Sequence, residues 1–220
     1  MNYNYSVRNI NIDRVQQVKD LGIILTPSLN YQAHVLDLCC RANRTPGFIF
    51  RFSKQLSGSE ALKSLYCALV RQTLEYGSPI WSPHQKLLIN ELEKIQRRFV
   101  RMVGFKMGFP YLQVPIETIS LALGLQSLEE RRLIADTVLL HKIINGRVDC
   151  PDMLRQIHFK TPSNTRSTDL FIKQQHRTSY SANSTMVRVQ GAGNKVTRHV
   201  DFFQDSVNIL KKKIISLSQS

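Results

Sequence analysis

Apolar residues recur along most of the chain at steps of three and four, the spacing that gives an α-helix one buried face. The clearest such helix follows Ser57, and its apolar face is formed by Leu62, Leu65, Tyr66, Leu69, Thr73 and Tyr76. A second stripe contains Leu88, Leu92, Ile95, Phe99 and Met102. A third helix is predicted from the capping box of Ser127 and Glu130 to the stop at Asn145 and Gly146. Most of the chain is therefore predicted to be helical.

Other segments have interrupted or weaker patterns. A helical pattern begins near Ser28, and Pro46 followed by Gly47 is expected to kink this helix or split it in two. The remaining expected elements are a break at 77–83, short helices at 116–123 and after Pro151, and a final amphipathic segment at 201–215. Residues 160–198 are polar and weakly periodic, so we expect loops there, including a turn at 190–194 that contains a lone Gly-Ala-Gly.

The amino-terminal end has the pattern of strands. Residues 3–7 alternate in polarity, residues 18–26 are rich in Ile, Leu and Val, and polar residues separate the two runs. Pro27 ends the second run. We expect the two runs to be the arms of one hairpin. The predicted fold class is mainly α, with an amino-terminal β-hairpin followed by a helical bundle and a loop-rich basic carboxy-terminal region.

Composition points to a partner class. The chain has 220 residues, 42% of them hydrophobic, and a formal net charge of +14 with a pI near 9.9. It is long enough to bury a core, and its charge favours a polyanionic partner, nucleic acid first. No apolar run approaches the roughly 20 residues that span a bilayer, and the first residues lack a hydrophobic signal core. We therefore expect an intracellular protein with no membrane partner.

The strongest local signal for a binding site is the basic segment from Glu91 to Arg101. Its apolar stripe fixes one face to a core while the basic residues point elsewhere. The candidate phosphate-binding residues are Lys94, Arg97, Arg98, Arg101 and Lys106, with Arg131 and Arg132 as a second basic spot. The alternative is an ordinary solvated face, with Glu91 and Glu93 pairing within the helix.

Weaker signals follow in the carboxy-terminal half. More basic residues lie at Arg166, Lys173, Arg177, Arg188, Lys195 and Arg198. Tyr111, Phe171 and Tyr180 are candidates for stacking on bases, although filling a core is the commoner role of such rings. The lysines at 211–213 fit either a nuclear-localisation patch or the favourable charge at a helix carboxy terminus.

Nothing in the sequence predicts a catalytic or metal site. The chain has no Asp-Asp pair of the kind that holds two catalytic metal ions, and its six histidines and four cysteines show no metal-ligand spacing. The cysteines also suggest no disulfide framework. We expect no catalytic residue and no cofactor in this chain.

Several runs, in order, resemble one family, the reverse transcriptases of non-long-terminal-repeat retrotransposons, especially the jockey-like elements. The matching runs are VKDLGII at 18–24, LNY at 29–31 with His34, LY at 65–66, LVR at 69–71, LEYGSPIWSP at 74–83 and LEKIQRRF at 92–99. Weaker resemblance continues through Arg131-Arg132, RTSY at 177–180, Arg188 and Asn194 to DFF at 201–203. The family's fingers, palm, catalytic aspartates and endonuclease have no counterpart here.

The resemblance implies a part of a larger enzyme. It implies that Lys19, Asp20, Leu21 and Gly22 belong to a primer-grip hairpin at the end of the palm, and that the helices after it form the thumb. It also implies RNA-directed DNA synthesis with two Mg²⁺ ions in the intact parent, whose missing palm and fingers would be partners of this chain together with the RNA and DNA of the template-primer duplex. Tyr76 and Trp81 are interpreted as core packing.

From the pattern and the resemblance together we expect four regions: a palm-end hairpin at 1–27, a helical thumb-like region at 28–108, a helical region at 109–158, and a polar basic tail with a final amphipathic helix at 159–220. The location implied by resemblance is nucleus and cytoplasm. If the apolar side of Leu21, Ile23 and Leu25 is exposed, that exposure favours a fragment over a self-sufficient domain.

Two alternatives remain open. One is a degenerate or co-opted helical protein-interaction module whose basic surface only keeps it soluble. The other is an independent helix-turn-helix DNA binder, although no short helix pair with a clear recognition helix stands out in the sequence.

Overall fold

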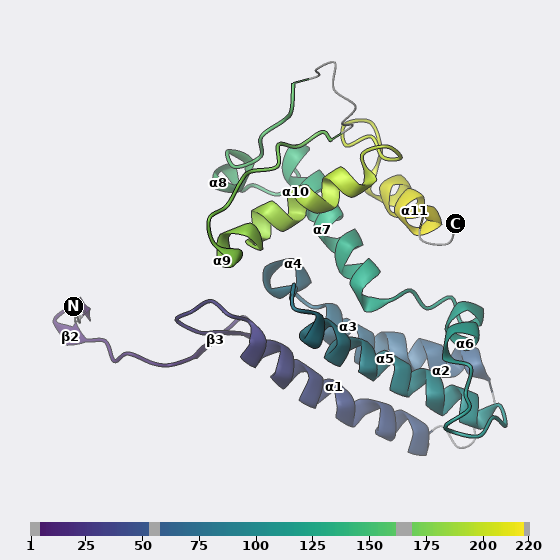
Figure 1. Cartoon of the computed structure of the whole chain (residues 1–220). Helices are drawn as coiled ribbons and strands as arrows, with labels where there is room; N and C mark the ends of the chain where they lie inside the picture. The colour runs from purple at the N-terminus through teal and green to yellow at the C-terminus, as the bar shows by residue number, and fades with distance from the viewer. Residues whose placement is uncertain (1–4, 53–57, 162–168, 218–220) are drawn as a thin grey trace.

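Figure 1 shows the computed structural model of the chain, which describes residues 5–52, 58–161 and 169–217. Its strands are β1 (Ser6–Val7), β2 (Ile10–Asn11), β3 (Val18–Asp20) and β4 (Ile23–Leu25). Its helices are α1 (Gln32–Phe52), α2 (Ser59–Tyr66), the π-helical turn η2 (Cys67–Arg71), α3 (Gln72–Glu75), α4 (Ser78–Trp81), α5 (Lys86–Lys106), α6 (Ile116–Ala122), α7 (Leu128–Ile144), α8 (Pro151–Leu154), α9 (Ser179–Ala182), α10 (Thr185–Val196) and α11 (Val207–Leu217). The predicted fold class, mainly helical with a small amino-terminal β-structure, is confirmed.

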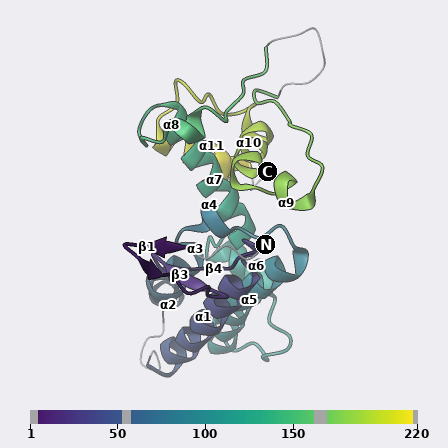
Figure 2. The ribbon, with the colours of Figure 1, turned by 90° about the vertical axis from the view of Figure 1, so that its left-hand side faces the viewer.

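Two hydrophobic cores divide the helices into two lobes (Figure 2). The first lobe, residues 18–128, buries side chains of β4 and α1 through α6. The second lobe, residues 134–217, buries side chains of α7, α10 and α11 around Phe171. Helix α7 belongs to both, since Leu128 at its start lies in the first core and Ile134 in the second. The region boundaries expected at 27, 108 and 158 stay predictions.

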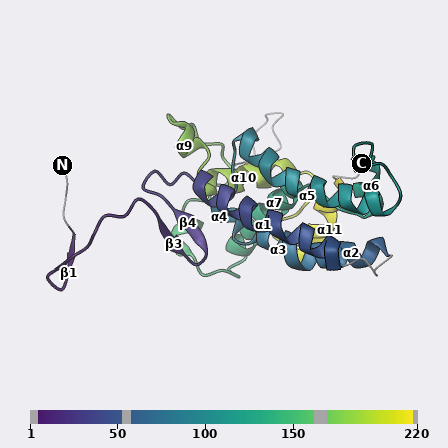
Figure 3. The same ribbon diagram turned by 90° about the horizontal axis from the view of Figure 1, so that it is seen from below.

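Three long helical rods form the first lobe. Viewed from below, α1 lies between α5 on one side and the α2–η2–α3 rod on the other (Figure 3). Large rings fill the space between them: Tyr66 stacks on Phe99 at 4.3 Å between ring centroids, and the Tyr66 hydroxyl donates to Gln96 Oε1 at 3.0 Å. Burial raises the pKa of Tyr66. The lobe is thus a packed scaffold from which outward-facing side chains are held in fixed directions.

Helix α1 runs without interruption through Pro46. Of the two outcomes expected at Pro46 and Gly47, the split into two helices is therefore wrong, and the kink stays a prediction. Pro46 itself is buried against the rest of the first lobe, together with its neighbours Ala42 and Ile49. Burial of this face stabilises the helix enough to offset the hydrogen bond that proline removes, which costs about 3 kcal/mol in an exposed helix.

The amino-terminal strands form two hairpins, not one. β1 pairs with β2, and β3 pairs with β4, each antiparallel and each across a two-residue turn. Both turn residues have positive φ in each case: 51° and 63° at Arg8 and Asn9, and 44° and 86° at Leu21 and Gly22. Such turns match the twist of a tight hairpin and close each strand on its neighbour. The expected pairing of 3–7 with 18–26 is wrong, and residues 3 and 4 lie outside the described residues.

Residues 169–198 contain more regular structure than their polar composition suggested. The turn expected at 190–194 is wrong, because these residues lie inside α10. Gly193 faces α7, where an added Cβ would stand 2.6 Å from Leu140 Cδ2 and 2.7 Å from Phe171 Cε2. The next side chain, Asn194, accepts from the Phe171 backbone N–H and donates to its carbonyl oxygen, both at 2.9 Å. The glycine therefore permits close packing of two helices.

Replacing Gly193 with Ala is expected to lower the free energy of unfolding by about 1–3 kcal/mol, because the new methyl group overpacks the second core. Gly191→Ala is the matched control in the same helix, since a Cβ there meets nothing within 4 Å. Alanine favours a helix over glycine by about 1 kcal/mol, so this variant should be neutral or stabilised. Urea unfolding followed by circular dichroism measures both, and equal effects at the two glycines would contradict this packing.

Candidate nucleic-acid interface

Helix α5 presents a basic face to solvent. Its opposite face is buried in the first core through Leu88, Leu92, Ile95 and Phe99. At 100° per residue, Lys94, Arg97, Arg98 and Arg101 all fall within about 60° of one direction on the exposed side. Lys94, Arg97 and Arg98 are exposed, and Arg101 is half-buried. Four predicted binding residues are thus brought together on one rigid helix; we name this set the α5 basic face.

Three of the four charges on this face have no ion-pair partner among the described residues. Lys94 pairs with Glu91 in the same helix. Arg97, Arg98 and Arg101 form no hydrogen bond or ion pair with any of the described residues. Of the two glutamates in the alternative interpretation, Glu91 does pair within the helix. Glu93 forms no ion pair with a described residue and accepts from the backbone N–H of Glu129 at 2.9 Å. Burial raises the pKa of Glu93, although the charge of Arg97 is among the influences that lower it. Three guanidinium groups therefore remain available to an outside anion.

The β3–β4 hairpin is the second candidate surface. Lys19, Asp20, Leu21 and Gly22 are all exposed, and Leu21 is 81% exposed at the tip of the turn. Tyr76 donates from its hydroxyl to the Leu21 carbonyl oxygen at 3.1 Å, and so holds the turn against α3. Tyr76 is itself exposed, so its interpretation as core packing is wrong, whereas Trp81 is fully buried.

The base of this hairpin is fixed to the first lobe. His34 of α1 accepts at Nδ1 from the Ile24 backbone N–H at 3.3 Å, and its ring meets Trp81 edge-on at 5.3 Å. Burial, and then the charge of Arg41, lower the pKa of His34, so the neutral ring that accepts this bond is favoured. Exposure of the apolar side formed by Leu21, Ile23 and Leu25 was expected to favour a fragment. Ile23 is buried, Leu25 is half-buried and only Leu21 is exposed, so the helices cover most of this side.

A hollow lies between the hairpin turn and the helices. It encloses about 490 Å³ and is lined by Leu21, Gly22, His34, Leu38, Arg41, Gln72, Thr73 and Tyr76. The hollow is therefore surrounded by the backbone of the turn, the amide group of Gln72, the hydroxyl groups of Thr73 and Tyr76, and the guanidinium group of Arg41. Arg41 is paired with Asp37 at 2.9 Å, which neutralises part of its charge.

The second basic spot is not a surface site. Arg131 forms a two-pronged ion pair with Glu75, and this hydrogen bond raises the pKa of Arg131. Arg132 is only 3% exposed, and burial lowers the pKa of its guanidinium, although Glu93 and Glu129 oppose the shift. Arg132 is therefore not on an open surface. Its Nη1 and Nη2 have no hydrogen-bond partner among the described residues and it lines a hollow with Asp136 and Lys195, so phosphate binding by Arg132 stays a prediction. Arg131 instead joins α7 to α3.

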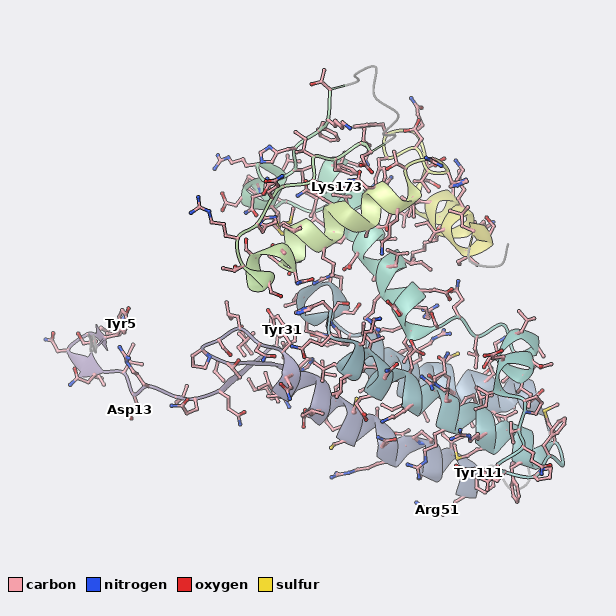
Figure 4. All side chains as sticks on the ribbon, viewed as in Figure 1. Tyr5, Asp13, Tyr31, Arg51, Tyr111 and Lys173 are labelled. Atoms are coloured by element: carbon pink, nitrogen blue, oxygen red, sulfur yellow. The ribbon has the colours of Figure 1, made fainter. Side chains whose placement is uncertain are left out.

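The other candidates are placed separately. Lys106 lies over the Phe50 ring at 5.8 Å, at the end of α5. Phe171 is fully buried and therefore fills the second core, whereas Tyr111 is exposed. Lys173 pairs with Asp169 on the second lobe, where Figure 4 labels it. The side chain of Tyr180 lies outside the described residues, as does all of Arg166.

The second lobe uses its basic side chains in different ways. Arg188 of α10 binds both carboxylate oxygens of Asp136 and two backbone carbonyl groups of the first lobe. Of the lysines at 211–213, Lys213 pairs with Asp205, while Lys211 and Lys212 are exposed. Arg177 and Lys195 are also exposed. Sequence reasoning had no signal that Arg188 joins the lobes, since its partners lie 52 and more residues away.

No candidate metal site is found within residues 5–52, 58–161 and 169–217. The His, Cys, Asp and Glu side chains of these residues nowhere gather in threes as a metal site requires. Two Mg²⁺ ions of the kind implied for a polymerase therefore have no fitting set of ligands among these residues. None of the described helices is both long and apolar enough to cross a bilayer.

A scan against models of known protein families finds no match, and searches of curated proteins and of solved structures find none either. The α5 basic face and the hairpin are therefore interpreted from their own geometry and from the residues quoted above.

Proposed function

We propose that this chain is the nucleic-acid-binding thumb and carboxy-terminal part of a retrotransposon RNA-directed DNA polymerase. In this proposal the α5 basic face holds the phosphates of an RNA template paired with a DNA primer. The β3–β4 hairpin lies toward the primer end. The chain contributes binding and no chemistry, so the catalytic carboxylates and their two Mg²⁺ ions belong to a palm outside this chain.

The observation that carries the proposal is the set of three unpaired arginines on one rigid face. Guanidinium groups bind phosphate through two parallel hydrogen bonds, and a packed helix presents them with little loss of backbone entropy. The spacing along α5 is also suitable, because a rise of about 1.5 Å per residue puts Lys94 and Arg101 roughly 10 Å apart, the span of a few phosphates.

The hairpin supports the same proposal in a different way. Large apolar side chains from Tyr5 to Leu21 are exposed, and they lie on the amino-terminal arm that projects from the helices in Figure 1. They are Tyr5, Val7, Ile10, Ile12, Val15, Val18 and Leu21. Isolated two-stranded hairpins are marginal in water. A chain whose palm is supplied elsewhere would leave such a surface, although a protein-interaction module would leave it as well.

A salt series on the purified 220-residue chain tests the proposal. We expect it to bind an RNA–DNA duplex of about 16 base pairs at low salt, with a slope of log K against log salt near −3 or steeper, because each phosphate contact contributes about −0.9. Fluorescence anisotropy measures the affinity. The decisive condition is a low salt concentration of about 20 mM, roughly a tenth of physiological ionic strength. If the chain binds no RNA–DNA hybrid, RNA or DNA duplex there, the proposal fails and the helical protein-interaction module is favoured.

A further inference from the structure

The end of the first lobe farthest from the hairpin mixes exposed aromatic and basic side chains. It comprises the ends of α1 and α5 and the loop at 107–115, and Figure 4 labels Arg51 and Tyr111 there. We name this region the tip. Its exposed apolar side chains are Phe48, Phe105, Met107, Phe109, Tyr111 and Leu112, from 39% exposed at Phe109 to 91% at Leu112. So many exposed large side chains in one place mark a binding surface.

The start of the tip loop is held by a regular helix stop. Gly108 has a φ of 96°, its N–H donates to the Phe105 carbonyl oxygen at 3.1 Å, and the Phe109 N–H donates to the Gly104 carbonyl oxygen at 3.1 Å. These two bonds are the Schellman pair that ends a helix at a left-handed glycine. The backbone that carries Phe109 is therefore fixed relative to α5.

The other end of the loop is pinned by close packing. Val114 is 8% exposed and lies against Gly104, where an added Cβ would stand only 2.4 Å from Val114 Cγ1. Between these anchors, Phe109 and Tyr111 project from a short loop that Gln113 closes by donating to the Pro110 carbonyl oxygen at 2.9 Å. Rings on such a loop lose little conformational entropy when they bind a ligand.

The tip continues the α5 basic face. Phe105 lies one helical turn beyond Arg101 and points within about 20° of the direction of Lys94. Phe105 lies against Phe50 of α1 at 6.3 Å between ring centroids, and the next residue of α1, Arg51, is exposed. Lys106 is half-buried, and residues 41–59 and 94–116 contain no Asp or Glu. A strand that follows the arginines would therefore reach the rings next, in a field of positive charge.

We propose that the tip binds unpaired nucleotides that continue from the duplex, by stacking their bases on Phe109 and Tyr111. This inference rests on the proposed function and adds a ligand class to it. A single-stranded segment has both groups that the tip fits: a phosphate backbone for Arg51, and flat bases for the rings. An anionic membrane is the competing partner. The tip favours nucleic acid, because Phe105 continues the row of arginines along α5 and the loop with Phe109 and Tyr111 begins where that helix ends.

Paired duplexes test the inference. One duplex is blunt, and the other carries an unpaired extension of about six nucleotides. This length falls within the roughly 4–16 nucleotides that a single-strand-binding site covers. Wild-type chain should bind the extended duplex about fivefold or more tightly per stacked base. Phe109→Leu with Tyr111→Leu keeps apolar bulk without rings, so this variant should bind both duplexes equally and the blunt one as wild type does.

The matched control is Leu112→Ser, which removes the most exposed apolar side chain of the tip but no ring. This control should still bind the extended duplex more tightly than the blunt duplex. The inference is overturned if wild type gains nothing from the extension while still binding blunt duplex, or if Leu112→Ser loses the gain. Binding of wild type to anionic phospholipid vesicles, lost in Leu112→Ser, would assign the tip to a membrane. Failure to bind blunt duplex would instead overturn the proposed function itself.

Discussion

Replacing Arg97, Arg98 and Arg101 together with Gln is expected to lower the affinity for an RNA–DNA duplex by on the order of a hundredfold at 0.1 M salt. Each arginine that neutralises a phosphate releases a counterion and contributes about −0.9 to the slope of log K against log salt. The slope of the triple variant should therefore be less negative than that of the wild type by about 2.7. Anisotropy titrations from low to high salt give both values. Gln keeps the stem and the helix propensity of arginine, so folding should be unchanged.

A matched control separates a local site from general charge. Arg177, Lys211 and Lys212 are exposed on the second lobe, and their replacement by Gln removes the same three charges. This control should keep most of the affinity and nearly all of the slope. If both triple variants lose binding equally, the partner is attracted by net charge alone and the α5 basic face is not the site.

The local pattern was enough to predict some elements closely. The capping box at Ser127 and Glu130 marked the start of α7, and the structure contains both of its hydrogen bonds, each at 3.1 Å. The apolar stripe of α5 likewise identified which of its faces is buried. Both signals act within a few residues, so they are visible without knowledge of the fold.

Other features depend on residues far away in the chain. Gly193 looks like a turn former in the sequence, but its missing side chain serves the contact with Leu140, 53 positions earlier. Arg132 lies beside Arg131 and looks equally exposed, yet the crossing of α7 over the first lobe buries it. The packing of distant elements decided each case, and no local pattern carries that information.

Sequence reasoning found the tip only in part: it named Tyr111 as a candidate for stacking on bases, but not Phe109 and not the way the two rings come together. Phe109 and Tyr111 sit among glycine and proline, which predicts only an irregular connection. Their exposure depends on the Schellman stop at Gly108 and on Val114 closing over Gly104. The absence of Asp and Glu around them is a further local signal, and it is informative only once α1 and α5 are known to end side by side.

Replacing Arg188 with Met is expected to lower the free energy of unfolding by about 3–5 kcal/mol, the cost of leaving a buried charge without its partner. Arg188 Nε donates to Asp136 Oδ2 at 2.8 Å, and its guanidinium also reaches the Pro79 and Ser82 carbonyl oxygens across the lobe boundary. Asp136 is only 3% exposed. Met keeps the apolar stem but donates nothing, so the carboxylate stays buried and unpaired.

The loss of unfolding free energy in the Arg188→Met variant should depend on pH. Burial raises the pKa of Asp136 above its ordinary value of 3.8, while Arg188 and then Arg132 oppose this shift. Without Arg188 the folded-state pKa rises further, so the folded chain binds more protons than the unfolded chain and gains stability as the pH falls through that pKa. The deficit of the variant should therefore narrow from pH 8 toward pH 5 and be largest at neutral and higher pH.

Urea unfolding at several pH values measures this. Trp81 is the single tryptophan and is fully buried beside the Pro79 and Ser82 acceptors, so its fluorescence follows the first lobe while circular dichroism follows both. The matched control is Asp136→Asn combined with Arg188→Met, which removes the charge with its partner and should regain part of the stability and lose the pH dependence. A deficit below about 1 kcal/mol, the range of exposed pairs, would show that this buried pair does not hold the lobes together.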